Sequence, residues 1–201
     1  MALNENQIKA INKDNGNVAV IATAGSGKTT VIINRIKRLI TECGVTPENI
    51  LAVTFSKKAK ENIQNKLPDE CCGVNVETFH SVALKIVQDY AHGTYELWVK
   101  SWEKEKCLFD ICKGLGLCAV KEDMPYNEIL KFIATQKINM RKSDNLIYDI
   151  DLPFTNSNMK IIYDEYEEYK EHHAYIEFDD LLNMACEIFE ESPETLEKYQ
   201  N

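Results

Sequence analysis

Apolar residues follow two different periodicities along the first 90 positions. Residues 18–21, 50–53 and 74–76 are short, largely apolar runs, which is typical of strands covered on both faces of a parallel sheet. After each run the apolar residues recur at spacings of three and four, which predicts helices over residues 32–40, 59–67 and 82–90. Strands that alternate with helices predict an α/β protein with a wound parallel sheet.

The strand signals stop near residue 92. From there to about residue 173 the pattern is helical, with breaks at Gly114-Leu115-Gly116, Met124-Pro125 and Leu152-Pro153-Phe154. We interpret this stretch as a mostly helical insertion. The predicted organisation is therefore a first part of the α/β domain at 1–91, the insertion at 92–173, and a segment at 174–201 that returns to the α/β domain.

A glycine-rich loop separates the first expected strand from the helix that follows it. Residues 22–29 read Ala-Thr-Ala-Gly-Ser-Gly-Lys-Thr and match the phosphate-loop pattern G-x-x-x-x-G-K-[ST], except that Ala22 replaces the first glycine. Gly25 and Gly27 allow backbone N–H groups to approach phosphate oxygens at the positive end of a helix. Lys28 would reach the outer phosphates, and the hydroxyl of Thr29 would coordinate Mg²⁺. The alternative, a glycine turn with an incidental lysine, fits the order of strand, loop and helix less well.

The charge of the chain is distributed unevenly. The formal net charge is −9, which by itself argues against a polyanionic partner. Residues 1–100 carry a net charge of +2, however, and residues 101–201 carry −11. An acidic second half therefore does not exclude a local basic groove in the first half.

The amino terminus, the apolar stretches and the cysteines indicate in which compartment the protein acts. The amino terminus lacks the basic and then apolar segments of a signal sequence, and no stretch approaches the roughly 20 apolar residues of a spanning helix, so we expect a cytoplasmic protein. The seven cysteines contain no C-x-x-C pair, which favours reduced, largely buried thiols. An iron–sulfur cluster on Cys107, Cys112 and Cys118 is the alternative, but their spacing matches no standard run.

Five segments, taken in order and spacing, resemble a known family. They are Leu-Asn-x-x-Gln at 3–7, Ala-Gly-Ser-Gly-Lys-Thr-Thr at 24–30, Val-Thr-Phe-Ser-Lys-Lys-Ala at 53–59, Thr-Phe-His-Ser at 78–81 and Phe-Asp-Asp-Leu-Leu at 178–182. In this arrangement the chain resembles the amino-terminal half of a superfamily 1 DNA helicase of the UvrD, Rep and PcrA type. The resemblance spans nearly the whole chain, although residues 92–173 contribute little to it, and Ala22 is the residue that this family usually has at the first loop position.

The resemblance implies a fold, an activity and partners. The fold is a RecA-like P-loop NTPase domain with an inserted helical subdomain, and the implied cofactors are ATP and Mg²⁺. The implied activity is ATP-dependent movement on single-stranded DNA, from 3′ to 5′, with duplex junctions and a second motor domain of the same polypeptide as partners. The family's Asp-Glu strand does not appear before residue 201, so we expect an incomplete sheet and no useful hydrolysis by this piece alone.

The resemblance also implies roles for individual residues. The nucleotide would be bound by Gln7, which would contact adenine, and by the loop residues Ala24, Gly25, Ser26, Gly27, Lys28, Thr29 and Thr30. Single-stranded DNA would be contacted by Thr54, Phe55, Lys57, Thr78, Phe79 and His80. The residues alone leave other roles open: Gln7 also suits a helix cap with Asn4, Phe55 suits a core, the lysines at 57–60 suit a solvated helix face, and a lone histidine is more often structural.

Other features of the second half invite competing interpretations. Residues 161–165 superficially resemble an apolar strand ending in Asp-Glu, but their helical spacing predicts an amphipathic helix with Asp164 and Glu165 in solvent. Asp179 and Asp180 open a helical run, where carboxylates favour the first turn. Trp98 and Trp102 suit packing within the insertion better than contact with duplex DNA.

The sequence is compatible with two alternative functions. A helicase subunit of a helicase-nuclease of the RecB or AddA kind shares the same motifs. A nucleotide-binding module without motor activity, regulatory or inhibitory, needs only the phosphate loop.

Overall fold

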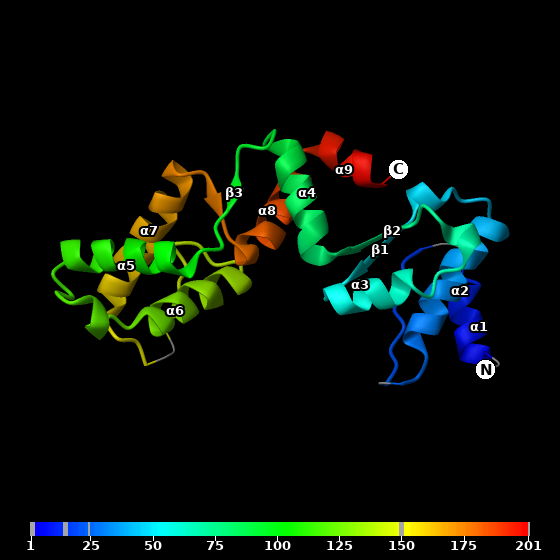
Figure 1. The fold of residues 1–201 in the computed structure, drawn as a ribbon, viewed down its shortest axis with the longest axis horizontal. Helices are drawn as coiled ribbons and strands as arrows, with labels where there is room; N and C mark the ends of the chain where they lie inside the picture. Colours follow the sequence, from blue (N-terminus) through cyan, green and yellow to red (C-terminus); the bar gives the residue numbers. More distant parts are fainter. Residues whose placement is uncertain (1–2, 14–15, 24, 149–150, 201) are drawn as a thin grey trace. The chain divides into compact units, whose positions relative to one another are not determined.

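The chain divides near residue 82 into two units that differ in secondary structure. The computed structural model describes residues 3–13, 16–23, 25–148 and 151–200. The described residues up to Val82 form one unit and those of Ala83–Gln200 form the other, so the division falls within helix α4 (Phe79–Tyr90). Figure 1 shows the elements of each unit. The three-part division at 1–91, 92–173 and 174–201 stays a prediction.

The first unit contains a parallel strand–helix–strand unit. Strand β1 (Leu51–Thr54) pairs in parallel with β2 (Asn75–Thr78), in a register that runs from Leu51 opposite Asn75 to Thr54 opposite Thr78. Helix α3 (Lys57–Gln64) lies between them in sequence and packs against both strands. Two short 3₁₀ turns, η1 (Pro47–Asn49) and η2 (Asp69–Cys71), precede the two strands. The strands expected at 50–53 and 74–76 are therefore confirmed, and so is the parallel α/β arrangement.

The prediction of a strand at residues 18–21 is wrong. Residues 17–23 carry no strand, and no ladder among the described residues includes them. Val18 and Val20 are exposed, and the side chain of Ile21 is 98% exposed. An apolar run becomes a buried strand only where neighbouring strands supply its hydrogen bonds, and in the described part of the chain β1 and β2 pair only with each other.

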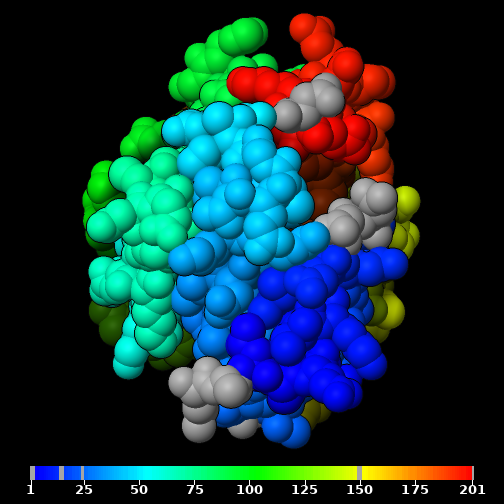
Figure 2. Space-filling model, turned by 90° about the vertical axis from the view of Figure 1, so that its right-hand side faces the viewer, coloured from blue at the N-terminus to red at the C-terminus, as the bar shows by residue number. Residues whose placement is uncertain are grey.

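Two helices of the first unit lie side by side. Helix α1 (Glu5–Ile11) packs against α2 (Lys28–Thr41), as Figures 1 and 2 show. The expected cap at the start of α1 is present: the Asn4 side chain accepts from the Gln7 N–H at 2.9 Å, and the Gln7 side chain accepts from the Asn4 N–H at 2.8 Å. The apolar face of α2 is anchored by the buried side chains of Val31 and Ile36.

The second unit is mainly helical. Its longer helices are α5 (Ser101–Gly114), α6 (Tyr126–Ile138), α7 (Asn156–His172), α8 (Phe178–Glu191) and α9 (Pro193–Gln200), with a 3₁₀ turn η3 (Lys121–Asp123). Its core is formed by buried side chains of α5, α6 and α7, among them Leu108, Ile129, Phe132, Ile162 and Tyr166. The helix expected over residues 161–165 is confirmed within α7. Among the described residues, no helix is both long and apolar enough to cross a membrane.

A very short parallel sheet pairs the segment before α5 with the segment after α7. Strand β3 (Glu96–Leu97) pairs with β4 (Tyr175–Ile176). The sequence pattern did not predict these strands because a two-residue strand shows no alternation. Trp98, which follows β3, is 2% exposed, stacks on Tyr166 and Tyr175, and donates from Nε1 to Glu103 at 3.1 Å. Packing is thus confirmed for Trp98, whereas Trp102 is exposed.

Candidate functional site

The glycine loop before α2 has the backbone that a phosphate cradle requires. Gly25 has φ +78° and Gly27 has φ +86°, both in the left-handed region that glycine adopts without strain. Gly27 is the residue that caps α2, and it offers no side chain of its own. Ser26 closes the turn, since its hydroxyl donates to the Thr23 carbonyl at 2.7 Å. Ala24, expected to contribute to this loop, lies outside the described residues.

Lys28 lies over this loop rather than pointing away from it. Its Nζ donates to the carbonyl oxygens of Ala22 at 2.8 Å and Thr23 at 2.7 Å. The side chain is nevertheless exposed, so the ammonium is held at the loop and remains accessible to an anion. This position suits a lysine that contacts the outer phosphates of a nucleotide.

The start of α2 adds a positive electrostatic end to the loop. The first backbone N–H groups of a helix have no partner within it, and the aligned peptide dipoles favour an anion there. Thr29 and Thr30 occupy this first turn, with Thr29 partly buried and Thr30 exposed. The Thr29 hydroxyl fits Mg²⁺ as one oxygen ligand, because this ion normally takes its remaining ligands from phosphates and water. In the described part of the chain, no three side chains of His, Cys, Asp or Glu type gather into a metal site.

Gln7 joins the first helix to the loop. While its Oε1 completes the cap of α1, its Nε2 donates to the carbonyl oxygen of Ser26 at 3.0 Å. The capping role that the sequence left open is therefore present, together with a contact to the phosphate loop that the sequence did not predict. Contact of Gln7 with adenine stays a prediction.

Two of the expected DNA-contacting residues are buried at the ends of the strands. Thr54 accepts the N–H of Ser56 at 3.2 Å and donates to its carbonyl at 3.0 Å, while Thr78 accepts the N–H of Ser81 at 3.2 Å. Both threonines are only 8% exposed. Their hydroxyls therefore shape the turns that follow β1 and β2, and their direct contact with DNA stays a prediction.

The next residue along each strand is an exposed phenylalanine. Phe55 is 90% exposed and Phe79 is 41% exposed, and their ring centroids lie 5.0 Å apart. A core role for Phe55 is thereby excluded. Two exposed aromatic rings in contact form a surface on which nucleobases can stack.

Basic side chains lie next to this aromatic pair in sequence. Lys57 and Lys58 are exposed in the first turn of α3, whereas Lys60 forms an ion pair with Glu77 of β2 at 2.8 Å. The solvated-face interpretation thus fits two of the three lysines, and both of these are available to a phosphate backbone. His80 is partly buried in the first turn of α4, and its contact with DNA stays a prediction.

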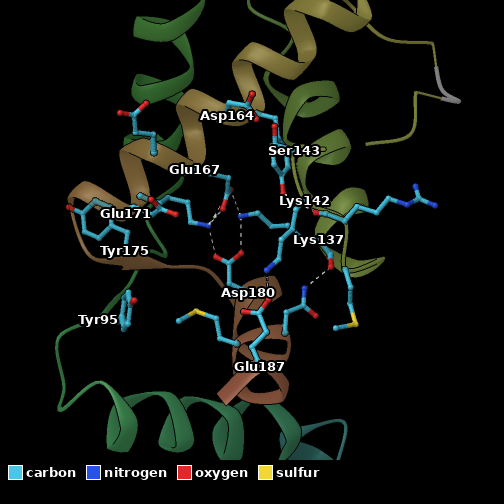
Figure 3. Close-up of a pocket in the computed structure, with 17 residues that line it drawn as sticks. Tyr95, Lys137, Lys142, Ser143, Asp164, Glu167, Glu171, Tyr175, Asp180 and Glu187 are labelled. Atoms are coloured by element: carbon cyan, nitrogen blue, oxygen red, sulfur yellow. Dashed lines mark hydrogen bonds and ion pairs between the residues drawn. The ribbon is translucent and has the colours of Figure 1, made fainter. Parts of the chain in front are cut away.

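The second unit contains a cavity of about 590 Å³ with a buried ion network at its wall (Figure 3). Lys137 of α6 is at the centre of the ion network. Its Nζ lies 2.7 Å from a carboxylate oxygen of Glu177, 2.8 Å from one of Glu167 and 3.0 Å from one of Asp180. Lys170 of α7 also contacts Asp180, at 2.6 Å. The expectation that Asp180 begins a helix is confirmed, and its carboxylate is paired with these lysines.

The network shifts the pKa values of Glu177 and Lys137. Burial alone would raise the pKa of Glu177, but the positive charges of Lys137 and Lys170 and the hydrogen bond from Lys104 lower it to about 2. Burial would likewise lower the pKa of Lys137, but Asp180, Glu167 and Glu177 outweigh it, so the pKa of this ammonium is raised. Glu177 and Lys137 are therefore both charged at neutral pH, and their charges are satisfied by each other and by their neighbours rather than offered to a ligand.

These two buried lysines are not among the residues predicted to be functional, although the sequence contains a signal for their burial. Lys137 follows the buried Ile133 by four residues in α6, and Lys170 follows the buried Tyr166 by four residues in α7. Residues four apart share a helix face, so both lysines lie on core-facing sides. A charge on an apolar face indicates a buried partner of opposite sign.

Comparisons with known proteins match nearly the whole chain. A family profile described as "UvrD/REP helicase N-terminal domain" matches residues 3–201. DNA helicase II of Rickettsia typhi is 32% identical over 212 residues, which cover 98% of this chain and 31% of that protein. YjcD of Bacillus subtilis is 30% identical over 217 residues, covering 100% of this chain and 27% of that protein. The ATP-dependent DNA helicase PcrA of Staphylococcus epidermidis is 26% identical over 208 residues, which cover 99% of this chain and 28% of that protein. The chain thus spans less than a third of the length of these relatives.

Proposed function

Because the chain belongs to the UvrD/REP helicase N-terminal domain family, we propose that it is the ATP-binding part of an ATP-dependent DNA helicase. In this proposal residues 22–30 hold the phosphates of ATP, and the exposed rings after β1 and β2 contact single-stranded DNA. The whole protein couples ATP hydrolysis to movement from 3′ to 5′, with a second motor domain and duplex junctions as partners. The chain and its partners act in the cytoplasm, and the first unit is part of a wound RecA-like sheet.

The observation that carries the proposal is the position of Lys28. Its ammonium lies at a loop with two left-handed glycines, in the first turn of a 14-residue helix. Phosphate binding needs an accessible positive charge, open backbone donors and a helix amino terminus, and these are the three features that meet here. Gln7 would add recognition of adenine, since an amide both donates and accepts.

Mg²⁺ fits this site through the hydroxyl of Thr29. When bound with ATP, the ion neutralises charge on the outer phosphates. The chain's own contribution is to hold the phosphates with Lys28 and the loop N–H groups and to present the Thr29 oxygen.

The exposed aromatic pair favours a DNA-contacting chain over a nucleotide-binding module without motor activity. Phe55 and Phe79 have no packing reason to be exposed together at the ends of neighbouring strands. A helicase-nuclease subunit would use the same residues, so that alternative stays open as a variant of the same proposal.

The test is nucleotide binding by the 201-residue chain with Lys28→Ala. Titration with a fluorescent ATP analogue and Mg²⁺ should show affinity reduced about ten- to hundredfold, because a charge-assisted contact to phosphate is lost. Lys66→Ala, which removes another exposed lysine of the same unit, should bind as the wild type does. Equal affinity of the two variants would show that the loop is not the phosphate site.

Catalysis by these 201 residues alone is a separate matter. We expect no useful turnover, and phosphate release measured with ATP, Mg²⁺ and an oligonucleotide checks it. A rate of about 1 per second or above, typical of working enzymes, would contradict this expectation.

A further inference from the structure

Helix α1 is held to its neighbours at both ends. At its start Gln7 Nε2 donates to Ser26 in the glycine loop at 3.0 Å. At its end Arg35 Nη1, from the middle of α2, donates to the carbonyl oxygens of Ala10 at 3.0 Å and Ile11 at 3.3 Å. A helix of seven residues does not persist by itself in water, so its placement depends on such tertiary contacts.

The Arg35 contact is well matched chemically. The last carbonyls of a helix lack intrahelical partners and carry the negative end of its dipole, and Arg35 supplies donors and a permanent positive charge to two of them. The guanidinium is partly buried, which strengthens the interaction relative to one in open solvent. Ile11, whose carbonyl it binds, is itself buried. The end of α1 is therefore fixed against α2.

The contact between Gln7 and the glycine loop, at the start of α1, is close enough to depend on where α1 lies. A methyl group added at Gly27 would lie only 2.8 Å from Gln7 Nε2, so the amide occupies the space directly beside the loop backbone. If α1 shifted along α2, Gln7 would either leave Ser26 or press on Gly27. The position of α1 and the conformation of the loop are thus mechanically linked.

We propose that Arg35 is a positioning residue for the phosphate loop: it fixes α1 so that Gln7 braces the Ser26 carbonyl and holds the loop open for phosphate. This inference rests on the proposed function, because the ligand of the loop is the phosphate group of a nucleotide. Arg35 itself makes no contact with that ligand. Its effect is transmitted through α1 and Gln7.

A double-mutant cycle on the full 201-residue chain tests the proposal. Arg35→Met, Gln7→Met and the double variant are titrated with a fluorescent ATP analogue and Mg²⁺. Arg35→Met should weaken binding about fivefold, the scale of one ordinary hydrogen bond, because the loss at α1 reaches the loop only through Gln7. The double variant should bind no more weakly than Gln7→Met alone, since both changes remove the same brace.

Arg35→Lys separates positioning from mere stabilisation of the fold. Its ammonium can still donate to one of the two carbonyls, so it should recover most of the affinity that Arg35→Met loses. If both single effects multiply in the double variant, or if Arg35→Met lowers the melting temperature while ATP affinity is unchanged, Arg35 is only structural and the proposal is overturned.

Hydrogen exchange without nucleotide distinguishes this inference from the proposed function. The amides of Ser26 and Val31, which donate to the carbonyl oxygens of Thr23 at 3.4 Å and Gly27 at 3.0 Å, should exchange faster in Arg35→Met than in the wild type, whether or not the chain binds ATP. A wild-type chain that binds no ATP would overturn the proposed function. Unchanged exchange at these amides would overturn the role of Arg35 by itself.

Discussion

The rings of Phe55 and Phe79 touch because their strands are in register. Thr54 is paired with Thr78 at the ends of β1 and β2, so the residue that follows each threonine emerges at the same edge of the sheet. The ring centroids lie 5.0 Å apart with an interplanar angle of 47°. A one-residue slip between the strands would separate the pair, so the register itself builds this aromatic surface.

Phe55→Ala should weaken binding of single-stranded DNA without affecting stability. Stacking of a base on an aromatic ring contributes about 1–3 kcal/mol, which corresponds to a loss of roughly five- to 150-fold in affinity. Because Phe55 is 90% exposed, the melting temperature should stay nearly unchanged. Fluorescence anisotropy with a labelled oligonucleotide measures the affinity.

Tyr90→Ala is the matched control for this experiment. Tyr90 is also an exposed aromatic residue, at the far end of α4 from Phe79, and its removal should leave DNA affinity as it is. A large drop in melting temperature for Phe55→Ala would contradict the prediction, because a ring that is 90% exposed should contribute little to stability.

Gly27→Ala should destabilise the first unit more than Gly25→Ala. Both residues have positive φ, so either alanine adopts a strained backbone at a cost of about 1–2 kcal/mol. Only at Gly27 does the added methyl meet a neighbour, Gln7 Nε2 at 2.8 Å, and this amide can make room only by giving up its hydrogen bond to Ser26; at Gly25 nothing lies within 4 Å. Urea unfolding of the two variants measures the difference. Equal free energies of unfolding would show that the methyl group at residue 27 meets no resistance from Gln7.

The ion network predicts a loss of stability in acid. The pKa of Glu177 is about 2 in the folded chain against an ordinary 4.5, so the unfolded chain takes up the proton first as pH falls. The stabilisation from this carboxylate is on the order of 3 kcal/mol, is complete above about pH 4.5, and is lost as pH falls from there towards 2. Urea unfolding at pH 7, 5 and 3 follows this loss.

Glu177→Gln should remove part of this acid dependence. At pH 7 the variant should be less stable by about 3 kcal/mol, because Lys137 keeps its burial but loses one counter-charge. Glu190→Gln, an exposed carboxylate on α8, should behave as the wild type at every pH. Parallel stability profiles for Glu177→Gln and the wild type would show that Glu177 does not carry the acid transition.

Local patterns predicted the elements whose hydrogen bonds or packing are nearby. The cap of α1 depends on Asn4 and Gln7, three residues apart, and the helical spacing around Ile162 was enough to reject a strand. The prediction of a strand at residues 18–21 failed because burial of this apolar run depends on neighbouring strands rather than on its own composition.

The contacts that link distant segments could not be derived from spacing alone. Nothing in the sequence pairs Gln7 with Ser26, or Arg35 with the end of α1, because these bonds depend on how two helices lie together. The exposure of Phe55 was equally undetermined, since an apolar residue at a strand end suits a core or a binding surface.

The uncovered apolar side chains around Ile21 and Leu51 have a practical consequence for handling the chain. Among the described residues, 17–23 belong to no strand and β1 pairs only with β2, and an open strand edge beside exposed aliphatic groups is a template for edge-to-edge association between copies. Concentrated samples should therefore aggregate through the exposed apolar residues around Ile21. Light scattering over a dilution series would reveal the aggregation, and Ile21→Lys should reduce it. Dilute conditions are the appropriate choice for the binding measurements.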